Sequence, residues 1–336
     1  MNEIFIGNMK EEVINGFIVS EKRKAIWNVE LGLLKKLDEV CKKHSLRYWL
    51  DSGTLLGAIR HQGFIPWDDD IDVVMPRKDY DKLYEISKEE FCYPYFYQNI
   101  YSENNYPGIL SKLRDCRTTA ISKNWLFNDI NQGIFIDVLP LDGVPNSKQE
   151  FDDLTDIASK KAKNIRFYYE YDRILSLKPQ VIKTLSQRRN HSRETIGNSL
   201  DYVNAFREYE NLFRKYDYET STMVGTIAFT LENKRQLIYS RECFNDTLYL
   251  NFEKLTVPVP IGYDEILKSY YGSDYMTPRK VKIYLTPYYF DPSISYRKHL
   301  EKLRKEYSLL NRIKKEICSI FDISIQSEYE RKLLSY

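Results

Sequence analysis

The stretch Tyr48–Tyr80, which reads YWLDSGTLLGAIRHQGFIPWDDDIDVVMPRKDY, decides the fold of this chain. It opens with a short strand signal at Tyr48–Leu50, passes through a glycine-containing turn at Ser52–Gly57, and continues into residues that suit a short helix. From Asp68 to Met75 acids alternate with apolar residues, which predicts a strand with one polar and one buried face. A strand, a turn, a helix and a second strand therefore follow one another closely.

The acids at the start of that second strand are the sharpest chemical signal. The segment Trp67–Asp72 carries four carboxylates beside residues that should be buried, and such crowding is costly without a counter-charge. Because strand side chains alternate between faces, we expect Asp70 and Asp72 to project the same way. Two hard oxygen ligands at this spacing suit Mg²⁺ or Mn²⁺.

Two other interpretations of these acids are weaker. A solvated acidic loop would not be followed by the apolar residues Ile71, Val73 and Val74. A calcium-binding EF-hand loop counted from Asp68 would need glycine and glutamate where the chain has Val73 and Asp79.

The glycine turn suits a phosphate group. Gly53 lets backbone amides approach a ligand, and Thr54 offers a hydroxyl at the N-terminus of the expected helix. The motifs of a P-loop and of a dinucleotide-binding fold are both missing here. A plain structural turn is the alternative, but its place shortly before the acids favours the phosphate hypothesis.

Periodicity extends the prediction to the rest of the chain. Apolar positions at helical spacing predict helices, and apolar alternation predicts strands. The expected elements are a helix from Glu21 to about His44, a strand at Gly133–Leu139 with Asp137 opposite its apolar side chains, helices between 151 and 218, strands between 225 and 260, and helices at Tyr263–Tyr271 and Arg297–Phe321.

Composition restricts the class of protein. The 336 residues are 43% hydrophobic and 29% charged, which is typical of a folded soluble protein. A formal net charge of +2 is too small to predict a nucleic-acid partner. Five scattered cysteines without a C-x-x-C pair predict reduced thiols and no zinc site. With no secretory signal and no apolar run of about 18 residues, we expect a cytoplasmic protein.

A basic segment motivates a hypothesis of membrane contact. Residues 160–194 hold ten lysines and arginines against three acids, and Arg297–Phe321 is amphipathic and basic. Such segments are typical of peripheral contact with an anionic membrane, here at the inner face of the plasma membrane. Solvated helix faces are the alternative.

The stretch Tyr48–Tyr80 resembles the LicD family, phosphotransferases that include the fukutin group and share the nucleotidyltransferase fold. Further pieces agree in order: KLRD at 112–115, GIFIDVLPLD at 133–142, and FE, VPVP and YYG between 252 and 272. The resemblance implies an α+β fold, with a nucleotidyltransferase-like mixed sheet flanked by helices. The expected organisation is a lead at 1–20, a catalytic core at 21–145 plus 220–285, a basic helical insertion at 146–219, and a C-terminal helical segment at 286–336.

The resemblance also implies an activity. A substituted phosphoryl group, phosphocholine first, would pass from a CDP-linked donor such as CDP-choline to a hydroxyl of a cell-envelope glycan, and CMP would leave. Teichoic acid, capsule and lipopolysaccharide are candidate acceptors, and the acceptor could be lipid-linked. The alternatives are a glycerol- or ribitol-phosphate transferase, a GT-A glycosyltransferase that also uses D-x-D, and a scaffold without activity.

Each candidate residue has an expected role in that chemistry. Asp70 and Asp72 would hold Mg²⁺ or Mn²⁺, and Asp137 would complete the set or take the acceptor's proton. Asp68 and Asp69 would surround these ligands or cap a helix, and Trp67 would pack beneath the site. The residues expected to contact the donor phosphate are Ser52, Gly53, Thr54, Arg60, Lys112 and Arg114, with His61 as a further contact or a structural neighbour.

Overall fold

The computed structural model describes residues 3–103, 105–106, 108–122, 125–126, 128–177, 202–226, 237–278 and 288–306. The chain divides into two compact units. The first comprises Met1–Tyr106, Leu110–Leu139 and Cys243–Tyr336, and the second comprises Pro107–Ile109 and Pro140–Glu242. Every residue of the expected acidic site falls in the first unit.

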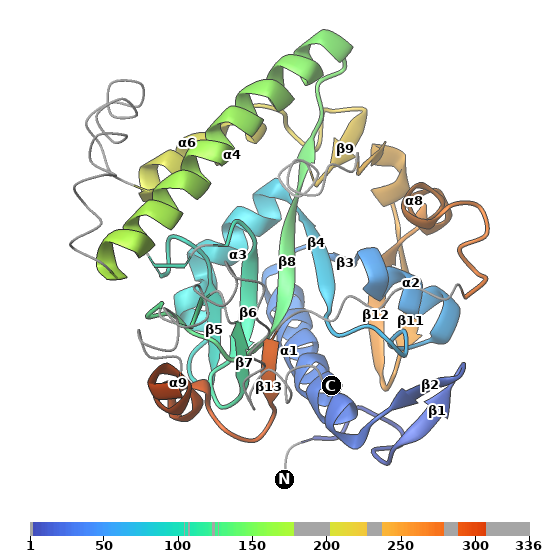
Figure 1. The fold of residues 1–336 in the computed structure, drawn as a ribbon. Coiled ribbons are helices and arrows are strands. Elements are labelled where there is room, and N and C mark those ends of the chain that lie inside the picture. Colours follow the sequence, from blue (N-terminus) through green and yellow to red (C-terminus); the bar gives the residue numbers. More distant parts are fainter. Residues whose placement is uncertain are drawn as a thin grey trace, which may run out of the picture. The chain divides into compact units, whose positions relative to one another are not determined.

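The predicted first helix is confirmed as α1 (Glu21–His44), the long blue helix of Figure 1. Its apolar stripe, which includes Leu33 and Leu37, is buried. The helix begins where the hydroxyl of Ser20 accepts a hydrogen bond from the N–H of Arg23, and ends at Ser45 in the left-handed conformation.

A mixed sheet forms the centre of the first unit. The strands β3 (Trp49–Leu50), β4 (Asp72–Pro76), β8 (Ile134–Gly143), β6 (Ser111–Asp115) and β5 (Tyr95–Gln98) lie in that order, and β8 passes on into the second unit. The pairs β3–β4, β8–β6 and β6–β5 are antiparallel. All residues of β6 and β8 are buried, so β8 is covered on both faces and not on one as its alternation indicates.

Two boundaries near the acids differ from the prediction. The strand begins at Asp72 and not at Asp68, and the carbonyl of Asp68 bonds to side chains of α1 instead of to a neighbouring strand. The stretch Ser52–Gly57 is helical and not a turn, since α2 (Ser52–His61) starts at Ser52. The helix α3 (Arg77–Glu90) then follows β4.

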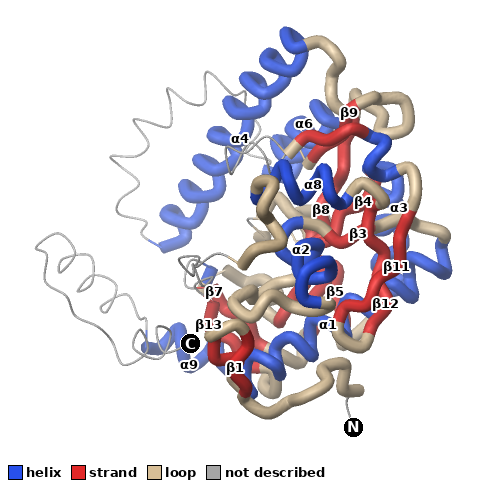
Figure 2. The backbone as a smooth tube through the Cα atoms, turned by 90° about the vertical axis from the view of Figure 1, so that its right-hand side faces the viewer, coloured by secondary structure: helices blue, strands red, loops and turns tan. Residues whose placement is uncertain are grey.

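Further elements complete the first unit. An N-terminal hairpin, β1 (Glu12–Ile14) and β2 (Phe17–Val19), turns at Asn15 and Gly16, which both have positive φ. Figure 2 shows a second hairpin, β11 with β12. The remaining bounds are β7 (Thr119–Ser122), η2 (Arg241–Phe244, which begins in the second unit), β11 (Thr247–Phe252), β12 (Leu255–Pro260), α8 (Tyr263–Tyr271), β13 (Tyr288–Asp291) and α9 (Tyr296–Glu306). The predicted helix at Tyr263–Tyr271 is confirmed.

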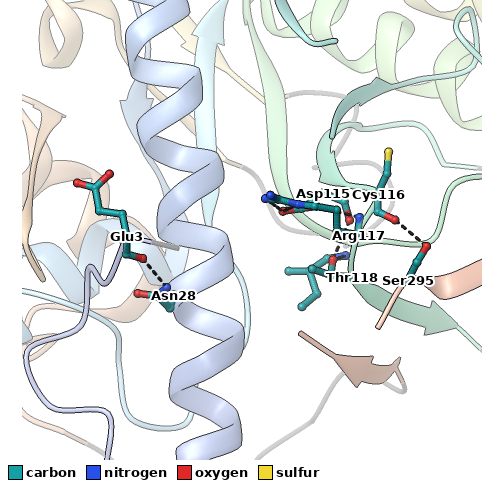
Figure 3. A network of polar contacts seen from close by, with 8 residues as sticks. Glu3, Asn28, Asp115, Cys116, Arg117, Thr118 and Ser295 are labelled. Atoms are coloured by element: carbon teal, nitrogen blue, oxygen red, sulfur yellow. Dashed lines mark hydrogen bonds and ion pairs between the residues drawn. The ribbon is translucent and has the colours of Figure 1, made fainter. Parts of the chain in front are cut away.

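The chain's last described segment is tied to the turn that follows β6. β13 pairs antiparallel with β7. The hydroxyl of Ser295 donates to the carbonyl of Cys116 at 2.7 Å, beside the Asp115–Arg117 ion pair, as Figure 3 shows. These contacts fix where β13 starts and which of its side chains face inward.

The second unit contains a helix pair and the end of β8. α4 (Lys148–Leu177) and α6 (Tyr202–Phe213) pack side by side (Figures 1 and 2). β9 (Met223–Gly225) pairs with the last residues of β8 and with β10 (Ile238–Ser240). The helical prediction for 151–218 is confirmed for 151–177 and 202–213, whereas residues 214–218 form turns. Residues 178–201 of this stretch and 307–321 of the last predicted helix lie outside the described residues. Among the described helices, none combines the length and the apolar character needed to cross a bilayer.

Candidate active site

Three carboxylates meet beside the central sheet. Asp70, Asp72 and Asp137 each offer an oxygen within 4.8 Å of the others. Asp72 is the first residue of β4, and Asp137 lies in β8, where its N–H donates to the carbonyl of Ile71 at 2.8 Å. Asp70 precedes the strand, so a loop brings it to Asp72 and strand alternation does not.

That loop is held by α1. The guanidinium of Arg23 donates to the carbonyl oxygen of Asp68 at 2.7 Å, and the indole of Trp27 donates to the same oxygen at 3.1 Å. Asp68, Asp69 and Asp70 form a second group of close carboxylates and keep part of their surface exposed. The helix therefore fixes the backbone of the loop, and the three carboxylates face one another.

Crowding shifts the titration of these acids. Burial and the neighbouring charge of Asp69 raise the pKa of Asp68 to about 7. Burial, and then the charges of the adjacent aspartates, raise the pKa values of Asp70 and Asp72 well above the usual range. A cation would relieve this repulsion. Carboxylate oxygens alone make up the cluster, and such a hard donor set fits Mg²⁺ or Mn²⁺.

The backbone of Asp72 is held on both sides. Its N–H donates to the Thr54 hydroxyl oxygen at 2.9 Å, and its carbonyl accepts from the N–H of Asp51 at 3.0 Å. Thr54 is 3% exposed, so its hydroxyl orients Asp72 and is not open to a ligand. This placement differs from the expected role of Thr54 in holding phosphate.

Asp51 is a site residue that the sequence reasoning did not single out. Its carboxylate accepts from the hydroxyls of Tyr270 at 2.9 Å and Ser52 at 3.2 Å, and burial raises its pKa. Its negative charge also contributes to raising the pKa of Asp72. The sequence signal for Asp51 was an acid directly before the glycine turn. Sequence spacing could not show that Tyr270 on α8 contacts it.

Gly53 is required by the acid that lies against it. A Cβ at this position would collide with the carboxylate of Asp68. Ser52, one residue earlier, has a positive φ of 52°. The first turn of α2 therefore faces the acidic loop, and contact of Ser52 and Gly53 with a donor phosphate stays a prediction.

Lys112 is a cation bonded to one of the three carboxylates. It lies opposite Asp137 in the β6–β8 register, and its ammonium donates to Asp137 Oδ1 at 2.5 Å. The ammonium also lies 3.6 Å from the centroid of the Phe135 ring. Burial lowers the pKa of Lys112, and the charge of Asp137 opposes that shift. The pair balances one charge of each sign inside the site.

Arg114 occupies a deeper position. It is fully buried and donates to the side chain of Gln98 and, at 2.6 Å, to the carbonyl of Gly133. Its guanidinium lies 4.7 Å from the Phe135 ring, and one of its amino nitrogens has no hydrogen-bond partner. Arg114 thus ties Gln98 of β5 to Gly133, the residue before β8. Because it is fully buried, it does not reach a phosphate in this arrangement.

Arg60, His61 and Trp67 form a group at the end of α2. Arg60 donates to the carbonyl of Tyr275 at 2.7 Å. Burial and the charge of Arg60 lower the pKa of His61 to about 4, so the imidazole is neutral near pH 7. Trp67 is partly exposed and packs edge-on against His61 and Phe17, at centroid distances of 6.3 and 6.4 Å. The structure thus places Trp67 beside the acidic loop.

Comparison with known proteins shows which family the chain resembles. A family model described as LicD/FKTN/FKRP, nucleotidyltransferase domain, matches residues 45–152. The chain is 31% identical over 252 residues to the lipopolysaccharide cholinephosphotransferase LicD of Haemophilus influenzae, spanning 73% of this chain and 88% of that protein. It is 29% identical over 150 residues to an uncharacterized protein of Rickettsia prowazekii, spanning 44% of this chain and 52% of that protein. A shorter match, 53% over 34 residues, covers 10% of this chain and 7% of the human ribitol 5-phosphate transferase FKRP.

Proposed function

The chain belongs to the LicD family of phosphotransferases, and from this premise we propose that it transfers phosphocholine from CDP-choline to a hydroxyl of a cell-envelope glycan. The name of the Haemophilus influenzae relative, a lipopolysaccharide cholinephosphotransferase, supports both the group transferred and the class of acceptor. The acceptor class includes lipopolysaccharide, teichoic acid and capsule, with or without a lipid carrier.

The observation that carries the proposal is the convergence of Asp70, Asp72 and Asp137, with Lys112 bonded to the last. These three aspartates would hold Mg²⁺ or Mn²⁺. When bound, such an ion neutralises charge on the donor's phosphates and aligns them for displacement.

The transfer itself makes one bond at phosphorus and breaks another, and a side chain of the protein takes the proton. An acceptor hydroxyl oxygen forms a bond to the phosphorus that carries choline, while the bond from that phosphorus to the bridging oxygen of CMP breaks. The hydroxyl proton passes to a carboxylate, for which Asp137 is the candidate, and CMP leaves with the bridging oxygen. Lys112, which is bonded to Asp137, is the candidate to contact a phosphoryl oxygen of the donor.

One other transfer has specific support. The match to the ribitol 5-phosphate transferase covers 34 residues and favours a polyol-phosphate donor as the second candidate. The chemistry at phosphorus would be the same, and the head group would differ. A GT-A glycosyltransferase would instead release UDP from a UDP-sugar.

A donor screen tests the proposal. The protein, with Mg²⁺ or Mn²⁺ and lipopolysaccharide or teichoic acid, is incubated separately with CDP-choline, CDP-glycerol, CDP-ribitol and UDP-sugars. We expect CMP from CDP-choline together with choline on the acceptor. Release of CMP only from CDP-ribitol or CDP-glycerol would show that a polyol phosphate, and not phosphocholine, is transferred. Release of UDP without CMP would overturn the proposal.

A further inference from the structure

We propose that Trp125 and Tyr288 form the subsite for the quaternary ammonium of the donor's head group. This inference rests on the proposed phosphocholine transfer and goes beyond it, because it names the residues that would select choline. Tyr288 lies outside the region that the family model matches.

Strand alternation in β13 sets the orientation of Tyr288. Tyr288 and Phe290 pack against the buried cluster that contains Phe135, together with apolar residues of α1. Tyr289 points to the other face and packs against the cluster that includes residues of α9. Pairing of Tyr288 with Ser122 in β7 fixes this register.

The rings of Trp125 and Tyr288 stand as two walls. Their centroids are 6.4 Å apart and their planes meet at 73°. Both side chains are partly exposed, whereas the rings behind them are buried: Phe135 lies 5.4 Å from Tyr288, and Tyr106 lies 5.8 Å from Trp125. The outer pair is thus held rigidly by an inner pair.

The position of Trp125 is also fixed through its backbone. The side-chain amide of Gln132 donates to the carbonyl of Trp125 at 3.0 Å, and Gln132 is fully buried. A preorganised wall loses little conformational entropy when a ligand binds.

The walls lie within the electrostatic reach of the acidic site. Burial raises the pKa of Tyr288 most, the charge of Arg114 opposes the shift, and Asp137 and Asp70 raise it further. Tyr288 therefore lies close enough to Asp137 and Asp70 for their charges to act on its ring, with Arg114 as the opposing positive charge. The nearby positive charge of Lys112 is balanced by its bond to Asp137.

This arrangement fits the chemistry of choline. A trimethylammonium group has no hydrogen to donate, and proteins bind it with the faces of tryptophan and tyrosine rings. Two methylene groups separate it from its phosphate, so the head group extends only a short way from the carboxylates. A polyol head group would instead require hydrogen-bonding partners.

Variants that remove one ring test the subsite. We expect Trp125→Leu and Tyr288→Leu each to raise the KM for CDP-choline and the inhibition constant of tetramethylammonium about tenfold. Inhibition by CMP, which lacks the head group, should not change. Tyr289→Leu is the matched control, since it removes a ring from the same strand on the opposite face, and it should leave all three values unchanged.

A second measurement separates cation binding from packing. Global replacement of tryptophan by increasingly fluorinated analogues weakens the ring's attraction for a cation and leaves its shape nearly unchanged. Affinity for tetramethylammonium should fall stepwise with fluorination, while affinity for the neutral tert-butanol should stay constant. The same series in Trp125→Leu, which replaces only the other three tryptophans, should show no dependence on fluorination.

The outcomes distinguish the subsite from the function. If the wild-type protein uses CDP-choline but neither the leucine variants nor fluorination changes recognition of the cation, the subsite is wrong and the function stands. If the wild-type protein uses CDP-ribitol and rejects CDP-choline, the proposed function fails first, and the subsite fails with it.

Discussion

At the scale of single residues, repulsion within the carboxylate cluster lowers the stability of the fold. Asp70 and Asp72 repel each other and their neighbours when no cation is bound, as their raised pKa values show. For the double variant Asp70→Asn, Asp72→Asn we expect CMP release to fall at least about a hundredfold. The same variant should unfold at a higher temperature than the wild type in EDTA at pH 8.

The comparison of unfolding temperatures checks the second half of that prediction by differential scanning fluorimetry. A variant that keeps its transfer rate would remove the metal-site assignment. A variant that unfolds at a lower temperature in EDTA would show that other contacts of the two aspartates stabilise the fold by more than their mutual repulsion destabilises it.

The pH dependence of stability follows from Asp68. Its pKa is about 7 in the folded protein and about 4 when unfolded, so between these values the folded state binds more protons. The free energy of unfolding should therefore fall as the pH rises from about 4 to about 7 in EDTA, relative to Asp68→Asn. Urea titrations of both proteins across this window measure it. Equal slopes in the two proteins would contradict the assignment.

Lys112, unlike the crowded aspartates, should stabilise the fold, because its positive charge is paired with the negative charge of Asp137. Lys112→Met should leave Asp137 buried without its partner and lower the free energy of unfolding by about 3 kcal/mol. Lys112→Arg keeps the charge and should lose less. Urea denaturation in EDTA measures both, and equal losses would show that packing against Phe135, and not the ion pair, is what the lysine provides.

At the scale of elements, local sequence patterns predicted which helices and strands exist better than where they begin and end. The helical spacing from Glu21 predicts α1 to its last residue. In contrast, Asp68–Ile71 alternates like the strand that follows but is not part of it, and Arg23 and Trp27 hold its first carbonyl, that of Asp68. Sequence spacing does not contain those tertiary contacts. The N-terminal hairpin had a local signal that was overlooked, the pair Asn15–Gly16.

The ends of α1 offer a prediction of opposite signs. Ser20→Ala removes the N-cap hydrogen bond and should lower the free energy of unfolding by about 1 kcal/mol. Ser45→Gly relieves a left-handed residue, φ 55°, at the other end and should raise it by a similar amount. Chemical denaturation measures both. If Ser45→Gly also loses stability, the strain assigned to the C-terminal end of α1 is wrong, and if Ser20→Ala loses none, the N-cap assignment is wrong.

At the scale of the whole molecule, the acids of the site could be predicted because they lie in two short motifs. Strand pairing brings Asp72 and Asp137 together, and the loop before β4 brings Asp70 to them. Tyr270 and Tyr288 could not be predicted, since the 28 tyrosines are spread along the chain. Nor could the burial of Arg114 and Thr54, because the identity of a residue does not show whether its strand or helix turns it toward the interior.

Cation binding should stabilise the whole chain by mass action. At a free Mn²⁺ concentration of about a hundred times its dissociation constant, the free energy of unfolding should rise by about 2.7 kcal/mol. The double variant Asp70→Asn, Asp72→Asn should show no such rise. Calorimetric titration supplies the dissociation constant, and a wild-type protein indifferent to Mn²⁺ and Mg²⁺ would contradict the proposed site.

The basic segment 160–194 leads to a separate prediction about location. Its excess of positive charge should bring the protein to vesicles of anionic lipid at low salt and release it at high salt, because the attraction is screened. Flotation with anionic and neutral vesicles measures this. Absence from anionic vesicles at low salt would leave solvated helix faces as the explanation.

The contacts of Tyr270 and Ser295 have a consequence for synthesis on the ribosome. Tyr270 reaches back 219 positions to Asp51, and Ser295 reaches back 179 positions to Cys116. The aspartates emerge early from the exit tunnel, but the strand that carries Tyr288 follows much later. A nascent chain therefore carries all three carboxylates before the residues that bond to Asp51 and Cys116 have been added, so these contacts form only near the end of synthesis.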